Sequence, residues 1–133
     1  MTKDLDQQVR DRARHRCEYC LLPQDVHPWK FEIDHIIAEQ HGGRSESDNL
    51  ALCCPRCNRH KGTNIASIDP QLSALVRLFN PRTDVWREHF ELDSGAIVGK
   101  SGIGRATASL LQFNEPLRLS ARTALIVEGR FLI

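Results

Sequence analysis

The sequence predicts a small α+β domain built around a strand–loop–strand–helix unit. Two apolar runs, 31–37 and 49–53, have the length of short strands and flank a polar loop that contains a Gly-Gly pair. A segment at 55–62 follows, with proline at its first position and glycine at its last, which is typical of a short helix. Two Cys-x-x-Cys pairs bracket the unit. Most apolar residues elsewhere recur at helical spacing.

The composition is that of an ordinary globular protein, with 133 residues, of which 41% are hydrophobic and 26% charged. This length suits a single domain over 1–133. No apolar run approaches the roughly 18 residues of a membrane span, and the charged start of the chain lacks the apolar core of a signal peptide. We therefore expect a cytoplasmic protein without a membrane partner. The net charge of +1 does not by itself indicate a nucleic-acid partner.

The cysteines predict a structural zinc site. An odd number of cysteines, five, argues against a disulfide framework in the cytoplasm, whereas two Cys-x-x-Cys turns supply the four thiolates of a tetrahedral zinc site. Two redox dithiols are the alternative, but such a motif normally occurs once. The expected ligands are Cys17, Cys20, Cys54 and Cys57. The fifth cysteine, Cys53, could replace its neighbour, but only Cys54 has the required spacing from Cys57.

Helical patterns surround the central unit on both sides. The predicted helices are 4–16 (capped by Asp4 or Asp6, with an apolar stripe of Leu5, Val9 and Ala13), 72–79, 102–113, and a last helix capped by Asn114 with a stripe of Leu117, Ala121 and Leu125. Segments 21–30 and 63–71 have turn or linker composition. For residues 86–98 we predict a hairpin, or a helical turn leading into one, because Asp93-Ser94-Gly95 consists of residues that favour turns. We expect 70–133 to form a helical and hairpin extension that packs on the core.

The central unit carries side chains suited to phosphodiester hydrolysis. His35 can act as a general base, since a neutral imidazole titrates near the working pH. Asp34 and Asn58 offer oxygen ligands, which suit a hard cation such as Mg²⁺. Asp34 and His35 are neighbours on a predicted strand, so their side chains diverge, and a strand end would let both serve one site. The basic residues expected to contact phosphates are Arg56, Arg59, His60 and Lys61.

Taken together, these motifs resemble the HNH endonuclease family, in its His-Asn-Asn subtype with zinc knuckles. The resemblance covers about residues 15–63 and runs through DHII at 34–37, GG at 42–43, DNL at 48–50 and CPRCNRHKG at 54–62. It implies a ββα-metal (His-Me finger) core braced by the four-cysteine zinc site.

The resemblance also implies roles for single residues. His35 would be the general base, Asp34 and Asn58 would bind the catalytic divalent ion, and Asn49 would hold the loop and His35 in place through backbone hydrogen bonds. Many family members have histidine where this chain has Asn58. An amide oxygen is a harder ligand than imidazole, which favours Mg²⁺ or Mn²⁺ as the catalytic ion. The short helix would approach DNA from the minor-groove side.

The sequence therefore predicts a metal-dependent endonuclease that cleaves or nicks DNA, with RNA left open as a substrate. A non-catalytic zinc-ribbon module that binds nucleic acid is the alternative, and a zinc-stabilised interaction domain is a third reading. Neither requires Asp34, His35 and Asn58 together. The near-neutral charge is consistent with weak or assisted DNA binding, for instance as a homodimer.

Overall fold

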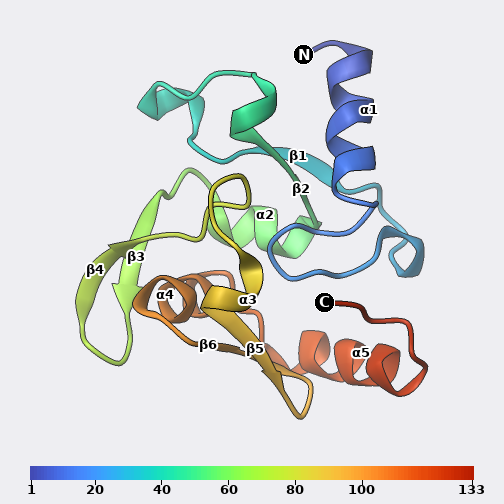
Figure 1. Ribbon diagram of the computed structural model, residues 1–133, viewed down its shortest axis with the longest axis vertical. Coiled ribbons are helices and arrows are strands. Elements are labelled where there is room, and N and C mark those ends of the chain that lie inside the picture. The colour runs from blue at the N-terminus through green and yellow to red at the C-terminus, as the bar shows by residue number, and fades with distance from the viewer.

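The computed structural model describes residues 1–133, and its elements follow one another in two groups (Figure 1). The first group consists of α1 (Lys3–Arg12), β1 (Glu32–His35), β2 (Leu50–Cys53) and α2 (Pro55–Lys61). The second consists of β3 (Ala66–Asp69), β4 (Ala74–Arg77), α3 (Trp86–His89), β5 (Phe90–Asp93), β6 (Ala96–Gly99), α4 (Gly102–Leu110) and α5 (Pro116–Val127). Short 3₁₀ helices occupy Gln24–Val26, Glu39–His41 and Ser47–Asn49.

The β1–β2–α2 unit has the predicted order of strand, loop, strand and helix. The strands pair antiparallel, with Glu32 opposite Cys53 and His35 opposite Leu50. Every residue of β2 is buried, so this strand forms the floor of the unit. Helix α2 starts at Pro55 directly after β2, which places its first turn beside the strand pair. The predicted α+β class and ββα arrangement are therefore confirmed.

Helix α1 begins at Lys3, one residue before the predicted start, and ends at Arg12, four residues before the predicted end. Thr2, rather than either aspartate, is the N-cap, and its hydroxyl accepts a hydrogen bond from the Leu5 amide at 3.1 Å. Arg14 and His15 have positive φ angles of 54° and 55°, which stop the helix before the first knuckle. The predicted apolar stripe does face inward, since Val9 is fully buried.

The helix predicted at 72–79 is wrong, because residues 66–77 form the β3–β4 hairpin. Leu72 is 65% exposed and Leu75 72% exposed, so the leucines that suggested an amphipathic helix do not contact the core. Ser73, with a φ of 55°, makes the turn, and the Ser73 amide donates to the Asp69 carbonyl at 2.8 Å. Asp69 is buried and pairs with Arg105 of α4, which ties the hairpin to that helix.

The predicted hairpin after residue 86 is confirmed, and a helical turn, α3, leads into it. The last helix lies close to its predicted position, but its cap and buried face differ. Glu115 caps α5, while Asn114 instead bonds both backbone polar groups of Ile97. Leu117 is 69% exposed, whereas Arg122 is buried beside Leu125. The face that α5 turns inward therefore includes arginine.

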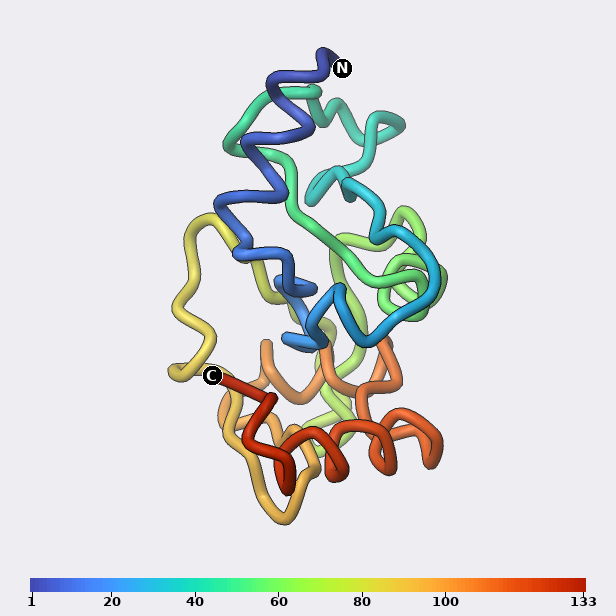
Figure 2. The backbone as a smooth tube through the Cα atoms, turned by 90° about the vertical axis from the view of Figure 1, so that its right-hand side faces the viewer, coloured from blue at the N-terminus to red at the C-terminus, as the bar shows by residue number.

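The hydrophobic core joins the two groups of elements. One cluster of 18 buried residues contains Val9 and Leu50 from the first group together with Phe90 and Phe113 from the second. The backbone trace shows the segment at 17–22 and α2 lying between the upper, N-terminal elements and the lower, C-terminal ones (Figure 2). No helix has the length and apolar character needed to cross a membrane.

Candidate active site and metal centre

The four cysteines of the two Cys-x-x-Cys pairs meet in the core. Their Sγ atoms all lie within 4.8 Å of one another, and all four residues are buried. The Sγ atoms of Cys20 and Cys54 are 3.7 Å apart. A tetrahedral zinc ion with Zn–S bonds of about 2.3 Å requires S–S separations of about 3.8 Å. Donor type, number and spacing therefore fit zinc, as the sequence predicts.

Each knuckle is shaped by local backbone hydrogen bonds to sulfur. Cys54 is the N-cap of α2, and its Sγ accepts from the Cys57 amide at 3.4 Å. The Sγ of Cys17 accepts from the Cys20 amide at 3.5 Å. The fifth cysteine, Cys53, is buried but does not belong to the group, as the spacing argument expected.

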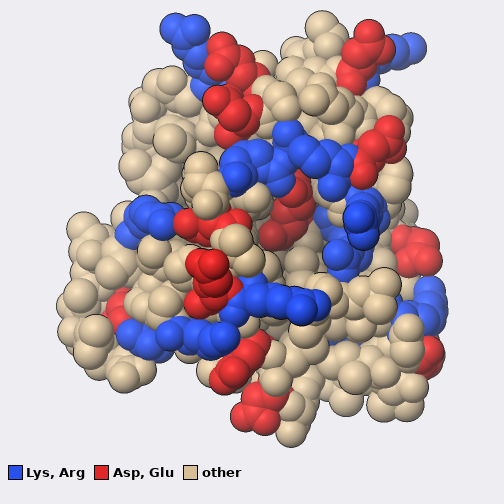
Figure 3. All heavy atoms as spheres, in the orientation of Figure 1, with Lys and Arg blue, Asp and Glu red and all other residues tan.

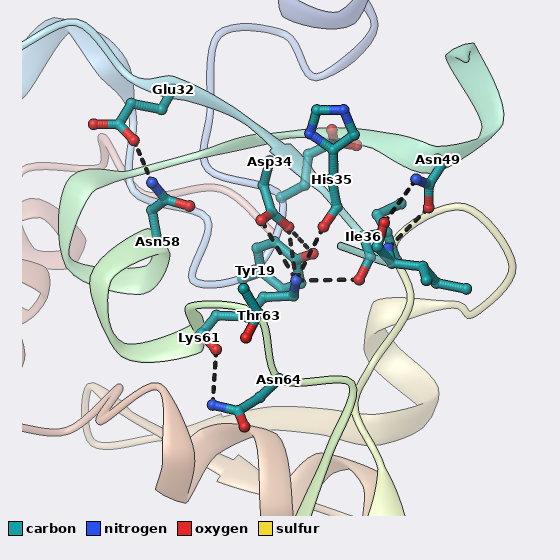
Figure 4. Close-up of polar contacts among 12 residues, drawn as sticks. Tyr19, Glu32, Asp34, His35, Ile36, Asn49, Asn58, Lys61, Thr63 and Asn64 are labelled. Carbon is teal, nitrogen blue, oxygen red and sulfur yellow. Dashed lines mark hydrogen bonds and ion pairs between the residues drawn. The ribbon is translucent and has the colours of Figure 1, made fainter. Parts of the chain in front are cut away.

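A separate open hollow lies between the end of β1 and the outer side of α2. Asp34, His35 and Asn58 all line it, so the structure brings three predicted site residues together (Figure 4). The remaining lining residues are Ile33, Ala38, Glu39, Gln40, Gly62 and Thr63. The hollow is open to solvent and mostly polar, which suits a charged, extended ligand better than a small apolar one.

Asp34 forms the inner wall of this hollow and is only 6% exposed. Its Oδ2 accepts a hydrogen bond from the Tyr19 hydroxyl at 2.8 Å and lies 3.1 Å from the Lys61 Nζ. Burial raises the pKa of the Asp34 carboxyl above its ordinary value, while the Lys61 charge and the Tyr19 hydrogen bond oppose that rise. Asp34 thus already has a cationic partner inside the protein.

Lys61 is placed differently from the expectation that it contacts phosphate. It is 1% exposed, and its side chain runs inward from α2. Besides Asp34, its Nζ bonds the backbone carbonyl oxygens of His35 at 3.2 Å and Ile36 at 3.1 Å. Lys61 therefore holds the end of β1 against α2. The basic run at 59–61 alone could not reveal this, because a lysine that follows a solvated arginine and histidine normally faces water.

His35 points away from Asp34, as expected for neighbours on a strand (Figure 4). Its Nε2 lies 2.8 Å from the Ser45 hydroxyl and 3.6 Å from the Glu39 carboxylate. Neither residue was singled out from the sequence, and no motif signals them, because the loop that follows β1 brings them to the ring. Nδ1 of His35 has no protein partner, which leaves this ring nitrogen available to a ligand.

Asn58 lies on the first turns of α2 and contacts a residue that sequence reasoning missed. Its amide nitrogen donates to the Glu32 carboxylate, which leaves its amide oxygen without a protein partner. Glu32 precedes Asp34 by two positions, so strand alternation places both on the same face of β1. That periodicity was the available signal for a second carboxylate near the predicted ion site.

Asn49 connects the loop to the strand that carries His35. Its side-chain oxygen accepts from the Ile37 amide at 2.9 Å, and its amide nitrogen donates to the carbonyls of Ile37 at 3.0 Å and Arg44 at 2.9 Å. Gly43 permits this close approach, since a Cβ there would lie 1.7 Å from the Ile37 oxygen.

The remaining basic residues of α2 differ in exposure. Arg59 is exposed, whereas Arg56 is 42% exposed and lies 3.4 Å from Glu115. Partial burial and the neighbouring Arg118 lower the pKa of His60. Lysine, arginine and acidic side chains are interspersed over the face in Figure 3, in keeping with the small net charge. The chain does not show one large basic field on that face.

Comparison with known sequences agrees with this geometry. A sequence model described as HNH endonuclease matches residues 17–64, the segment that contains both knuckles and the hollow. Over residues 17–64 the chain is therefore similar to the HNH endonuclease family. The HNH segment thus includes all four zinc-type cysteines and every predicted site residue, and its family implies the ββα-metal fold that β1, β2 and α2 form.

A similarity to one curated protein extends beyond the HNH segment. The chain is 25% identical over 111 residues to the Septu protein PtuB of Bacillus thuringiensis. The alignment covers 82% of this chain but 40% of PtuB, so the chain spans about two fifths of the length of that relative. The similarity therefore includes most of the C-terminal elements as well as the HNH segment.

Proposed function

We propose that this protein is a metal-dependent endonuclease that hydrolyses DNA phosphodiester bonds. The observation that carries the proposal is the hollow in which Asp34, His35 and Asn58 meet on the ββα unit of an HNH segment. A general base, oxygen ligands for a hard cation and a solvent-open site are the three parts that hydrolysis of a phosphodiester requires.

His35 takes the proton from the attacking water. Its Nε2 is engaged by Ser45 and Glu39, and when Nε2 donates to either of them the lone pair of the neutral ring lies on Nδ1. That nitrogen has no partner within the protein and can accept a proton from water. Asn49 keeps the loop in register with the strand end, so the histidine is presented from a fixed backbone.

Asp34 and Asn58 are the proposed ligands of the catalytic divalent ion, Mg²⁺ or Mn²⁺. Such an ion stabilises the negative charge that develops on the phosphate and on the leaving oxygen. The Asn58 amide oxygen has no protein partner, and Glu32 adds a carboxylate beside it. The donor set is hard oxygen throughout, which fits these ions better than zinc. Zinc is assigned to the four cysteines, where it has a structural role.

The exposed side of α2 is the proposed contact for the DNA backbone. Arg59 is free of protein partners in this region, and Arg56 is held only by a surface pair with Glu115. Surface ion pairs of this kind contribute little to stability, so Arg56 can leave Glu115 and bind a phosphate instead. Lys61 is not assigned to DNA contact, because its ammonium group is inside the protein.

One observation favours a second candidate function. The Lys61 ammonium already neutralises Asp34, so this carboxylate does not need a divalent ion to compensate its charge. Under this alternative the zinc centre and α2 would still bind nucleic acid, but no divalent ion would be required. The two functions differ in their dependence on His35 and on Mg²⁺ or Mn²⁺.

A plasmid assay separates them. Supercoiled DNA is incubated with the zinc-loaded protein in Mg²⁺, in Mn²⁺ or in EDTA, and zinc content is measured on the same preparation. We expect nicked or linear product only with the divalent ion, and a loss of at least about 100-fold in rate for His35→Ala, the usual contribution of a general base. His15→Ala, at an exposed histidine of the N-terminal segment, is the matched control.

The zinc measurement makes a negative result informative. A folded, zinc-loaded protein that shifts DNA in a gel but does not cleave it in either ion would support the binding module. Cleavage that persists in His35→Ala would remove that residue from the role of base.

A further inference from the structure

Arg118 connects the C-terminal helix to the four-cysteine centre. It lies in the first turn of α5, and its Nη2 is 2.9 Å from the Sγ of Cys57 and 4.0 Å from the Sγ of Cys54. These residues are separated by about half of the chain, yet α5 lies below the segment that contains the knuckles (Figure 2). The contact therefore joins the last helix to a knuckle in the middle of the chain.

The rest of the guanidinium is fixed by other contacts. Its Nη1 donates to the carbonyls of Leu111 at 2.5 Å and Gln112 at 3.1 Å, which follow the end of α4. Its Cζ lies 5.7 Å from the centre of the Phe113 ring. Arg118 is thus held on three sides and has a single orientation towards the sulfur atoms, rather than the freedom of a surface arginine.

The negative charge of the zinc–thiolate centre explains why a contact with an arginine is favourable. Four thiolates and one Zn²⁺ sum to a net charge of −2, and all four cysteines are buried. A buried charge is costly unless a partner compensates it. Arg122 is also on the inner face of α5, but it donates to the Gly95 and Phe113 carbonyls and to the Asn114 side chain. Arg118 is the arginine that bonds sulfur.

We propose that Arg118 is a positioning residue of the zinc centre, and that its hydrogen bond to the Cys57 thiolate couples zinc binding to the docking of the C-terminal helices. Groups that hydrogen-bond metal ligands tune affinity strongly, and their loss typically weakens metal binding 10- to 100-fold. Coupling of this kind is reciprocal, so zinc should also stabilise α5. The inference concerns the zinc centre and does not depend on catalysis.

Zinc affinity of the 133-residue chain is the decisive measurement. Competition with a chromogenic chelator compares wild type with Arg118→Gln, which removes the charge and keeps a long polar side chain. Arg130→Gln, just beyond α5 and 48% exposed, is the control. We expect zinc affinity to fall about tenfold or more for Arg118→Gln and to stay within twofold for Arg130→Gln. The Co²⁺-loaded protein should show a shifted thiolate-to-metal charge-transfer band in Arg118→Gln alone.

Two further measurements keep the proposal open to refutation. If Arg118→Gln does not fold, Arg118→Lys takes its place in the experiment. A lysine keeps the positive charge but lacks the planar guanidinium and its fixed set of N–H donors, so zinc affinity should still fall several-fold. In wild type, zinc removal should increase amide hydrogen exchange across 116–127. Unchanged zinc affinity together with an unchanged Co²⁺ spectrum in the folded variant would overturn the proposal, even if α5 itself became less protected, because that pattern describes a purely structural arginine.

Discussion

Replacing Lys61 with methionine tests how the end of β1 is held. The Lys61 ammonium lies 3.1 Å from Asp34 Oδ2 and bonds two backbone carbonyls at 3.1 and 3.2 Å, and Lys61 itself is buried. Removing one member of a buried ion pair costs about 3–5 kcal/mol, because the other charge stays buried without a partner. The Tyr19 hydroxyl still donates to Asp34 and reduces that cost, whereas the backbone carbonyls of His35 and Ile36 each lose a hydrogen-bond donor.

We expect Lys61→Met to lower the free energy of unfolding by about 4 kcal/mol at pH 7, a large share of the 5–15 kcal/mol typical of a domain. Urea unfolding followed by circular dichroism measures this, with Lys30→Met as the exposed-lysine control. In an Asp34→Asn background the same lysine change should cost much less, giving a coupling energy of about 2–3 kcal/mol. Equal losses in both backgrounds would mean that the two side chains do not stabilise each other.

The pH dependence gives an independent check. Burial already raises the pKa of Asp34, and without Lys61 it rises further. A carboxyl group whose pKa is higher in the folded state costs stability above that pKa, and the cost fades as the pH falls to the unfolded value of about 3.9. The deficit of Lys61→Met should therefore shrink between neutral pH and about pH 4. A deficit that is constant over this range would show that the carboxylate is not the group left unpaired.

Three more outcomes are expected. Asn49→Ala removes the hydrogen bonds that hold the loop against Ile37 and should reduce cleavage more than about tenfold while zinc content stays at wild-type level, measured on one preparation. Arg59→Ala should weaken DNA binding and reduce the salt dependence of the binding constant by about one unit of slope in a fluorescence titration, provided that this arginine contacts a phosphate. The Arg105 hydrogen bonds hold the pKa of Asp69 at about 2, so their stabilisation is present above about pH 4 and lost as the pH falls through 2. Urea unfolding of Asp69→Asn should show a flatter pH dependence in that interval.

The elements predicted best from sequence are those whose signals are local and chemical. Cys54 and Cys57 are three positions apart because a knuckle needs that spacing, and Pro55 and Gly62 mark the ends of α2 for steric reasons. Strand alternation likewise separated Asp34 from His35 correctly. Each of these inferences depended only on residues within a few positions of one another, and the structure retains them.

The elements predicted worst are those whose burial is decided elsewhere in the chain. Leu72 and Leu75 have helical spacing, yet the segment forms a hairpin because Arg105 of α4 binds Asp69 and fixes its first strand. The same holds for Leu117, whose side chain is exposed while Arg122 is buried. A hydrophobic pattern identifies a face only when apolar residues are the ones buried, and in both places a charged pair or an arginine network is buried instead.

Buried cations are the feature of the site that the sequence pattern did not reveal. A lysine or arginine is counted as a surface residue in any pattern, so Lys61 was predicted to contact DNA and Arg118 was not singled out. In the structure each compensates a buried negative group, Asp34 in one case and the cysteine thiolates in the other. Both come from helices that pack against the site from outside the strand pair. The ββα unit therefore relies on two helical cations to bury its acidic groups, which is why substitutions of Lys61 and Arg118 are the sharpest tests of the site.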